Sequence, residues 1–270
     1  MSKVWFITGA SAGFGRAIAE AAQARGDTVV ATARDPLSAA GFPHALRLDV
    51  TDGAQVDAAV AAAVAAHGRI DVVVNNAGHG LVGAVEEVSD AELRALLEVN
   101  LLGVWRVTRA VLPHLRHQGS GHIIALSSVG GIVGNPGHAA YATSKFALEG
   151  MSEALAGEVA PWGVRVTVVE PGPFRTEFAG RSLGMSAPLD AYSDTAAGTL
   201  RRRFRDQDGR QPNDPAKAAA AILRVVDHPA PPLRLPLGPE AVHRIRGKLH
   251  RQLVEIDEWE ALAVDTRFAE

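Results

Sequence analysis

Short apolar runs alternate with longer amphipathic stretches along most of the chain. Residues 28–31, 70–74, 122–126 and 165–169 form brief runs rich in β-branched side chains, as buried strands do. The stretches between them have the spacing of helices. Because parallel strands need crossover helices, this alternation predicts an α/β fold with a doubly wound parallel sheet flanked by helices.

The alanine-rich stretch 52–67 also fits a helix. Val56, Val60 and Val64 recur every four residues, and Gly68 follows. A repeat of four places the valines on one helix face, and glycine commonly ends a helix. We therefore expect an amphipathic crossover helix with a glycine stop rather than a low-complexity segment.

A glycine-rich turn, Thr8 to Gly15, follows the first apolar run at residues 4–7 and leads into a helical pattern. Backbone N–H groups in such a turn can approach a pyrophosphate at the positive end of the helix dipole. Three glycines could also form only a tight reversal. The strand before the turn and the helix after it supply the context that a dinucleotide site requires.

Tyr141 and Lys145 lie four residues apart where another helical run begins, and Ser128 ends a strand thirteen residues before Tyr141. Residues i and i+4 share a helix face, so we expect the Lys145 ammonium to lie near the phenol and to lower its pKa. A tyrosine tuned in this way can donate and accept a proton near neutral pH. Ser127, one residue further from Tyr141, is expected to be a structural hydroxyl.

Together these motifs resemble the short-chain dehydrogenase/reductase family over residues 3–178. The end of the chain resembles members related to 17β-hydroxysteroid dehydrogenases. The resemblance implies a single Rossmann-type domain over residues 1–270, a nicotinamide cofactor, and hydride transfer to or from a carbonyl carbon. Its further signs are Asp49-Val50, Asn75 to Gly78, Asn100 and Pro171 to Thr176.

The resemblance also implies a role for each of four catalytic residues. Tyr141 exchanges a proton with the substrate oxygen, and Ser128 hydrogen-bonds that oxygen. Lys145 binds the nicotinamide ribose as well as tuning the tyrosine. Asn100 holds a water that connects Lys145 to solvent, although a buried asparagine could instead only satisfy backbone groups.

Cofactor contacts are implied in several loops that follow strands. Asp49 and Asn76 would lie near the adenine and its ribose, although Asp49 could be only a turn residue. Pro171-Gly172 would border the nicotinamide, and Thr176 its carboxamide or phosphates. The complete set is Gly9, Ser11, Gly13, Phe14, Gly15, Arg34, Asp49, Val50, Asn76, Ala77, Gly78, Tyr141, Lys145, Pro171, Gly172 and Thr176.

The end of the second strand bears on the choice between NADP and NAD. NAD-dependent members place a carboxylate there for the ribose hydroxyls, whereas a 2′-phosphate needs a cation. Here Ala33 occupies the acidic position and Arg34 follows it. Asp35 precedes a proline, which favours a helix cap over a ribose ligand. Many NADP enzymes of the family carry a second basic residue just before the middle glycine of the turn, where this chain has Ala12. We nevertheless expect NADP as the cofactor, with NAD as the alternative.

The residues expected to face the substrate are mostly apolar: His79, Leu81, residues 129–138, and residues 174 to about 192. They predict a hydrophobic ketone or secondary alcohol. Residues 174 to about 192 belong mostly to a segment over residues 176–210 that we expect to form a mobile lid. His138 could contact a polar substituent, although a solvent-exposed loop histidine is the preferred interpretation. The arginines at 201–203 and 205 are interpreted as a solvated face. The apolar lid residues expected over the ligand are Phe178, Leu183, Met185, Leu189 and Tyr192.

Composition narrows the function classes. The chain has 270 residues, 47% of them hydrophobic, no cysteine, and a net charge of −3 from 27 basic and 30 acidic residues. We therefore expect a cytoplasmic protein with no nucleic-acid or membrane partner, no disulfide and no metal. The histidines show no metal-ligand spacing.

The last part of the chain predicts an assembly. The run 233–238 contains a proline, which a central strand tolerates poorly, and a helical extension is expected over residues 239–267. We expect a homodimer or homotetramer. Two other functions stay open: a 3-oxoacyl-carrier-protein reductase, with the arginine cluster as its only docking candidate, and a non-catalytic nucleotide-sensing regulator.

Overall fold

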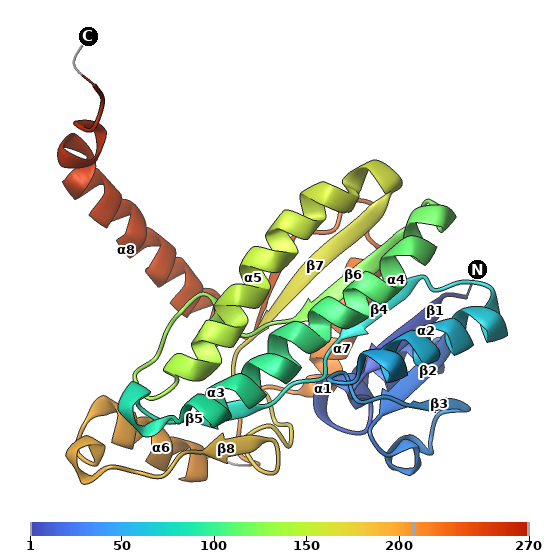
Figure 1. Cartoon of the computed structure of the whole chain (residues 1–270), viewed down its shortest axis with the longest axis horizontal. Helices are drawn as coiled ribbons and strands as arrows, with labels where there is room; N and C mark the ends of the chain where they lie inside the picture. Colours follow the sequence, from blue (N-terminus) through green and yellow to red (C-terminus); the bar gives the residue numbers. More distant parts are fainter. Residues whose placement is uncertain (1, 207–208, 269–270) are drawn as a thin grey trace.

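A parallel sheet of seven strands forms the centre of the protein (Figure 1). The computed structural model describes residues 2–206 and 209–268. Every strand pair in the main sheet is parallel, which confirms the doubly wound fold. Its order is β3 (His44–Arg47), β2 (Thr28–Ala33), β1 (Val4–Thr8), β4 (Val72–Asn75), β6 (Gly121–Leu126), β7 (Val164–Pro171) and β9 (Arg234–Leu237).

Helices cover both faces of this sheet. On one face α1 (Gly13–Ala24) packs against α7 (Pro215–Asp227), and the other face carries α2 (Gly53–His67), α4 (Val104–Gln118) and α5 (Ala139–Val159). Side chains alternate along each strand, so Trp5 and Phe6 enter opposite apolar clusters. Single-turn helical segments are Pro36–Ala39, Val85–Glu87, Val129–Gly131, Ala160–Trp162 and Asp190–Tyr192, and a π-helical turn spans Glu98–Gly103.

Helix α2 confirms the crossover helix expected from the alanine-rich stretch. The Asp52 carboxylate accepts hydrogen bonds from the N–H groups of Ala54 and Gln55, and Gly68 ends the helix with a φ of 71°. A side chain at Gly68 would strain this left-handed backbone.

A small second sheet was not expected from the sequence. Strands β5 (Gly80–Val82) and β8 (Leu183–Met185) pair in parallel beside α3 (Asp90–Leu97) and α6 (Ala196–Asp206). Each of these strands has only three residues and contains a glycine, so neither gives the alternating signal of a strand. The pairing nevertheless fixes the segment after β7 across the carboxyl edge of the main sheet.

The chain ends in β9 and a long helix, α8 (Pro239–Val264). Pro236 lies in β9 at the edge of the sheet, as expected for a strand with a proline. Ala241 and Ile245 pack against Val129 and its neighbours, and the remainder of α8 projects away from the body (Figure 1). In the part of the chain that the structure describes, no helix has the length and hydropathy of a membrane span.

Candidate active site

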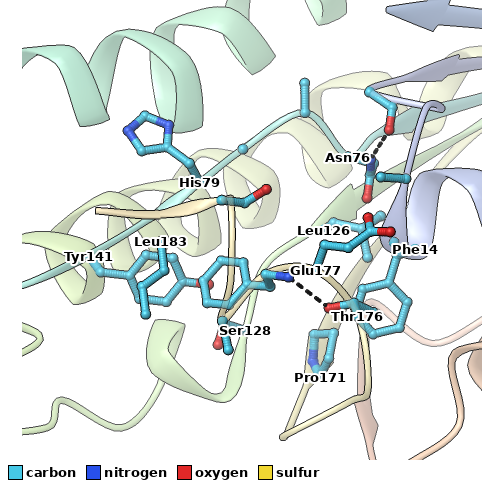
Figure 2. Close-up of a pocket in the computed structure, with 18 of the residues that line it drawn as sticks. Phe14, Asn76, His79, Leu126, Ser128, Tyr141, Pro171, Thr176, Glu177 and Leu183 are labelled. Atoms are coloured by element: carbon cyan, nitrogen blue, oxygen red, sulfur yellow. Dashed lines mark hydrogen bonds between the residues drawn. The ribbon is translucent and has the colours of Figure 1, made fainter. Parts of the chain in front are cut away.

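A cavity of about 1270 Å³ opens where the main strands end. Figure 2 shows its wall, with Tyr141 and Leu183 toward one end and Asn76 and Phe14 toward the other. All predicted catalytic and cofactor residues line this cavity except Gly15 and Asn100. The sequence signatures therefore converge on one site.

The glycine turn is built for a close backbone approach. Gly9 and Gly13 adopt φ angles of 65° and 55°, which favour glycine. A Cβ at Gly15 would lie 2.4 Å from both the Asn76 amide nitrogen and the Gly9 oxygen. Gly15 thus supports the turn from behind rather than lining the cavity.

Thr8 and Asn76 hold this turn against the neighbouring strand. Asn76 Nδ2 donates to the carbonyls of Thr8 and Gly9 at 2.9 and 3.0 Å. Thr8 Oγ1 accepts from the N–H groups of Asn76 and Ala77 at 2.9 and 3.0 Å. Sequence analysis did not assign this positioning role to Thr8, although its place at the start of the turn was a usable signal.

Tyr141 lies in the first turn of α5 and is 5% exposed. Burial raises the pKa of Tyr141 to about 12, and only a hydrogen bond with Ser128 opposes this shift. The expected lowering of the pKa by Lys145 is therefore wrong for this structure. The Lys145 Nζ lies 5.9 Å from the centroid of the Tyr141 ring. At this distance, desolvation of the phenol raises its pKa more than the lysine charge lowers it.

Lys145 is buried one turn further along α5. Its Nζ donates to the Leu126 carbonyl at 2.7 Å, which anchors the side chain to the end of β6. Burial lowers the pKa of Lys145 to about 8, and the nearby Glu149 carboxylate raises it. The lysine can thus exchange a proton closer to neutral pH than an exposed lysine can.

Ser128 and Ser127 have different surroundings. Ser128 caps a single helical turn, and its hydroxyl accepts from the Gly130 N–H at 3.0 Å while also bonding Tyr141. The hydroxyl of Ser127 lies near the Glu149 carboxylate. This agrees with the expectation that Ser128, not Ser127, is paired with the tyrosine.

Asn100 lies in the π-helical turn and is fully buried behind the cavity. Its amide accepts from the His79 N–H at 3.0 Å and donates to the His79 carbonyl at 2.9 Å. It also donates to Ser144 Oγ at 3.1 Å. The side chain therefore satisfies backbone groups, the alternative considered from the sequence, and the water-binding role stays a prediction.

At the far end, Arg34 is exposed and lines the cavity near Asp49. Asp35 accepts from the Leu37 N–H at 3.0 Å, so it caps the following turn as expected. The Asp49 carboxylate accepts from the Thr51 N–H and hydroxyl at 3.0 and 2.7 Å, which lower its pKa. Asp49 is thus a turn residue that also faces the cavity.

His138 is not the exposed loop histidine that was expected. It is 6% exposed, stacks on Tyr141 with ring centroids 4.7 Å apart, and contacts Phe204 at 5.1 Å. Burial lowers its pKa to about 4, so the ring is neutral at pH 7. The helix α6, which supplies Phe204, creates this burial and could not be placed from the sequence.

The arginine cluster also differs from the expected solvated face. Arg201 is 7% exposed, forms an ion pair with Glu87 at 2.7 Å, and donates to the Ser186 carbonyl. Arg203 lines the cavity. The helix turns Arg201 inward, while Arg202, Arg203 and Arg205 are exposed, Arg203 at the cavity.

Within the segment 176–210, of which residues 207 and 208 lie outside the described ones, residues 176–179, 181–184, 200, 203 and 204 line the cavity. Phe178 and Leu183 line the cavity. Met185, Leu189 and Tyr192 do not, and the Tyr192 hydroxyl instead donates to Glu86. Leu81 is likewise buried beside Tyr141 rather than lining the cavity. The mobility of this lid stays a prediction.

Within residues 2–206 and 209–268, no group of three or more potential metal ligands is close enough to hold an ion. Residues that sequence analysis missed include several at the substrate end of the cavity, which come from α6, from the loop between α6 and α7, and from α8. They are Leu200, Arg203, Phe204, Gln211, Glu240 and Arg244.

The match to a family decides what kind of protein carries this site. The family model described as short chain dehydrogenase matches residues 3–185. The chain belongs to the short-chain dehydrogenase family. It is therefore an oxidoreductase that acts on CH–OH and C=O groups.

Curated relatives and a solved structure agree with this membership. Oxidoreductase BOA17 of Botryotinia fuckeliana is 44% identical over 98% of this chain and 99% of its own. Human 17-beta-hydroxysteroid dehydrogenase type 1 is 36% identical over 72% of this chain and 60% of its own. The crystal structure of a short-chain dehydrogenase from Streptomyces avermitilis superposes with a TM-score of 0.92 at 47% identity, covering 99% of this chain and 100% of that one.

Structures of other family members contain either nucleotide. A Burkholderia phymatum member in complex with NAD has a TM-score of 0.81 and 25% identity. An alcohol dehydrogenase from Thermococcus sibiricus, in complex with 5-hydroxy-NADP, has a TM-score of 0.72 and 28% identity. Both nucleotide classes therefore occur among the structural neighbours of this dehydrogenase.

Proposed function

We propose that this dehydrogenase is an NADP(H)-dependent enzyme that interconverts a hydrophobic ketone and a secondary alcohol. The observation that carries the proposal is the meeting of Tyr141, Ser128 and Lys145 at one cavity whose other end is the glycine turn. Gly9, Ser11 and Gly13 of this turn line the cavity, so its backbone can approach a ligand there. This fits a nucleotide pyrophosphate.

The bound nicotinamide would supply or accept the hydride. The protein groups handle the proton and the charge on the substrate oxygen. In reduction, the neutral Tyr141 hydroxyl donates its proton to that oxygen, and the Ser128 hydroxyl stabilises the charge that develops there. The high pKa of about 12 for Tyr141 keeps the proton on the phenol until then.

Lys145 would hold the nicotinamide ribose and favour the tyrosinate that reduction leaves. Its ammonium donates to the Leu126 carbonyl and lies 5.9 Å from the centroid of the Tyr141 ring. Arg34 would pair with the 2′-phosphate of NADP because Ala33 leaves no carboxylate at the end of β2. Phe178, Leu183 and Phe204 give the substrate end its apolar surface.

Removing one oxygen tests the proposal. We expect Tyr141→Phe to bind NADP nearly normally and to lower turnover of a hydrophobic ketone by about two decades or more, because the group that donates the proton to the substrate oxygen is lost. Tyr192→Phe is the matched control, since its hydroxyl bonds Glu86 outside the cavity. The turnover of both variants is measured from the nicotinamide absorbance, with NADPH and with NADH. Equal turnover in the two variants would overturn the mechanism, and no turnover of ketones by the wild-type protein with either nucleotide would favour the regulator.

A 3-oxoacyl-carrier-protein reductase is the second enzyme candidate. Its docking face would require the arginines of α6, but Arg201 is already neutralised by Glu87. Turnover of a carrier-bound 3-oxoacyl group at a much lower KM than the free thioester would favour this candidate.

A further inference from the structure

The substrate end of the cavity carries two arginines that a neutral ketone does not require. Arg203 from α6 and Arg244 from α8 both line it. The Arg244 guanidinium donates to Asn135 Oδ1 at 2.5 Å. Burial and the charge of Arg203 lower the pKa of Arg244, so the two cations lie near each other.

Arg244 is half-buried, and among the described residues no carboxylate forms an ion pair with it. Glu240, one turn earlier on α8, also lines the cavity, but its carboxylate accepts from Asn213 Nδ2 at 3.0 Å. A partly desolvated cation such as Arg244 gains from a bound anion.

We propose that Arg203 and Arg244 bind a carboxylate on the substrate, so that the natural substrate is an apolar keto acid or the matching hydroxy acid. This inference rests on the proposed function. The rings of Tyr141, His138 and Phe204 contact one another in sequence, and they lead from the reacting phenol to the helix that carries Arg203. The acid would therefore lie at the other end of the substrate from the reacting carbon.

Binding of 5-oxo-5-phenylpentanoate and its methyl ester to the NADP⁺-saturated protein, measured by calorimetry, tests this subsite. We expect the acid to bind more tightly than the ester, and Arg244→Met or Arg203→Met to reduce this preference about tenfold or more. Arg205→Met is the control because Arg205 is exposed on α6 and does not line the cavity.

Equal binding of acid and ester by the wild-type protein, no binding of the acid, or the same loss in Arg205→Met would overturn the subsite. The readout does not depend on turnover. An arginine-dependent preference for the acid without ketone reduction would leave the subsite standing and count against the proposed reaction.

A different observation concerns the outer half of α8. Leu249, Leu253, Ile256 and Trp259 are 50, 60, 63 and 60% exposed. Their spacing of three or four residues places them along the helix face that carries the buried Ile245. Helix α8 projects beyond the body (Figure 1), and the face that packs on the body continues along the projecting part.

Basic and acidic residues occupy different halves of the projecting part of α8. Arg246, Lys248 and Arg251 precede the centre of the stripe, whereas Glu255, Asp257, Glu258 and Glu260 follow it. Two such helices in antiparallel orientation place each basic half against an acidic half, whereas parallel helices would oppose like charges. The complementary partner is therefore a second copy of this chain.

We infer that α8 forms an antiparallel, two-fold symmetric pair with α8 of a second copy, centred near Leu253. Such a centre brings Arg246 opposite Glu260 of the partner subunit, because the two positions are equally far from it. Leu249 and Ile256 would then exclude water between the helices.

The absence of cysteine from the sequence gives a direct test. Leu253→Cys should form a disulfide-linked dimer under mild oxidation at low protein concentration, whereas Val254→Cys, also exposed but on another side of α8, should not. In sedimentation, Arg246→Glu and Glu260→Arg should each weaken association about tenfold, and the double variant should restore it. No cross-link at residue 253, or double-variant association as weak as in the singles, would overturn the pairing.

Discussion

Buried carboxylates lie directly behind Lys145. Glu149 is 4% exposed and accepts from Arg234 Nε at 3.1 Å, and Glu170, which is 1% exposed, lies 3.6 Å from the same nitrogen. One arginine thus faces two buried acids. Burial and the Glu149 charge raise the pKa of Glu170 to about 7, with Arg234 opposing.

This pKa predicts a pH dependence of stability. A carboxyl whose folded pKa lies above its unfolded value holds its proton longer when folded, so its contribution is present at low pH and is lost as pH rises through about 7. We expect the free energy of unfolding to fall by about 1 to 3 kcal/mol between about pH 5 and pH 8, and Glu170→Gln to flatten this slope. Urea titrations measure it. Glu153→Gln, which alters an exposed partner of Arg234, should keep the wild-type slope.

Arg34 gives a prediction about cofactor choice. If its guanidinium pairs with the 2′-phosphate, Arg34→Ala weakens NADP binding by about 1.5 to 3 kcal/mol, as for other hydrogen bonds to charged groups, and barely changes NAD binding. Fluorescence titration with both nucleotides is the measurement. Equal losses for the two, or a wild-type preference for NAD, would contradict the NADP assignment.

The placement of the motif residues at the cavity was predictable from the sequence, because the members of each motif lie close together on a single element. Tyr141, Lys145 and the glycine turn belong to this group. His138 and Arg201 do not, since α6 and Glu87 determine their burial and approach from distant parts of the chain. The pKa of Tyr141 was mispredicted for the same reason: the lysine is local, but the desolvation is not.

At the scale of elements, the central strands and α2 follow from periodicity, whereas the segment across the cavity does not. That segment is held by contacts between short pieces: β8 on β5, Arg201 on Glu87, and the Leu189 N–H on the Glu87 carboxylate at 2.9 Å. Glu87 anchors the last two of these three contacts. An element made of such pieces has no sequence period of its own.

We predict that this segment is a lid that gains order when ligand binds. Its described residues 176–206 and 209–210 should exchange amide hydrogens faster in the free protein than with NADP⁺ and a bound ketone. Arg201→Met should increase exchange in the free state because it leaves Glu87 buried without its cation. Arg205→Met should have no such effect. Uniformly strong protection of the free segment would exclude a lid.

At the scale of the molecule, a sheet with reversed strand order gathers the site. The chain runs outward from β1 to β3 and then returns to β4 on the other side, so the loops after β1 and β4 diverge and leave a crevice. The alternation of strands and helices along the sequence made this sheet and its crevice predictable. The direction of α8 was not, because its outer half packs on nothing in the described chain and its periodicity is that of any amphipathic helix.

Removal of residues 249–270 separates the role of the body from that of the extension. The described side chains removed are all exposed, and Ala241, Arg244 and Ile245 remain, so the core and the cavity lose no contact. We therefore expect the truncated protein at low concentration to unfold within about 2 °C of the wild type, since surface changes have small effects.

The concentration dependence should differ between the two proteins. Association stabilises the folded state by mass action, so the unfolding midpoint of the wild type should rise with protein concentration if α8 pairs between copies. Truncation should reduce that rise, and scanning calorimetry over a hundredfold range of concentration measures it. An equal rise in both proteins would place the association on another surface, and a midpoint far below the wild type at every concentration would show that the extension supports the fold itself.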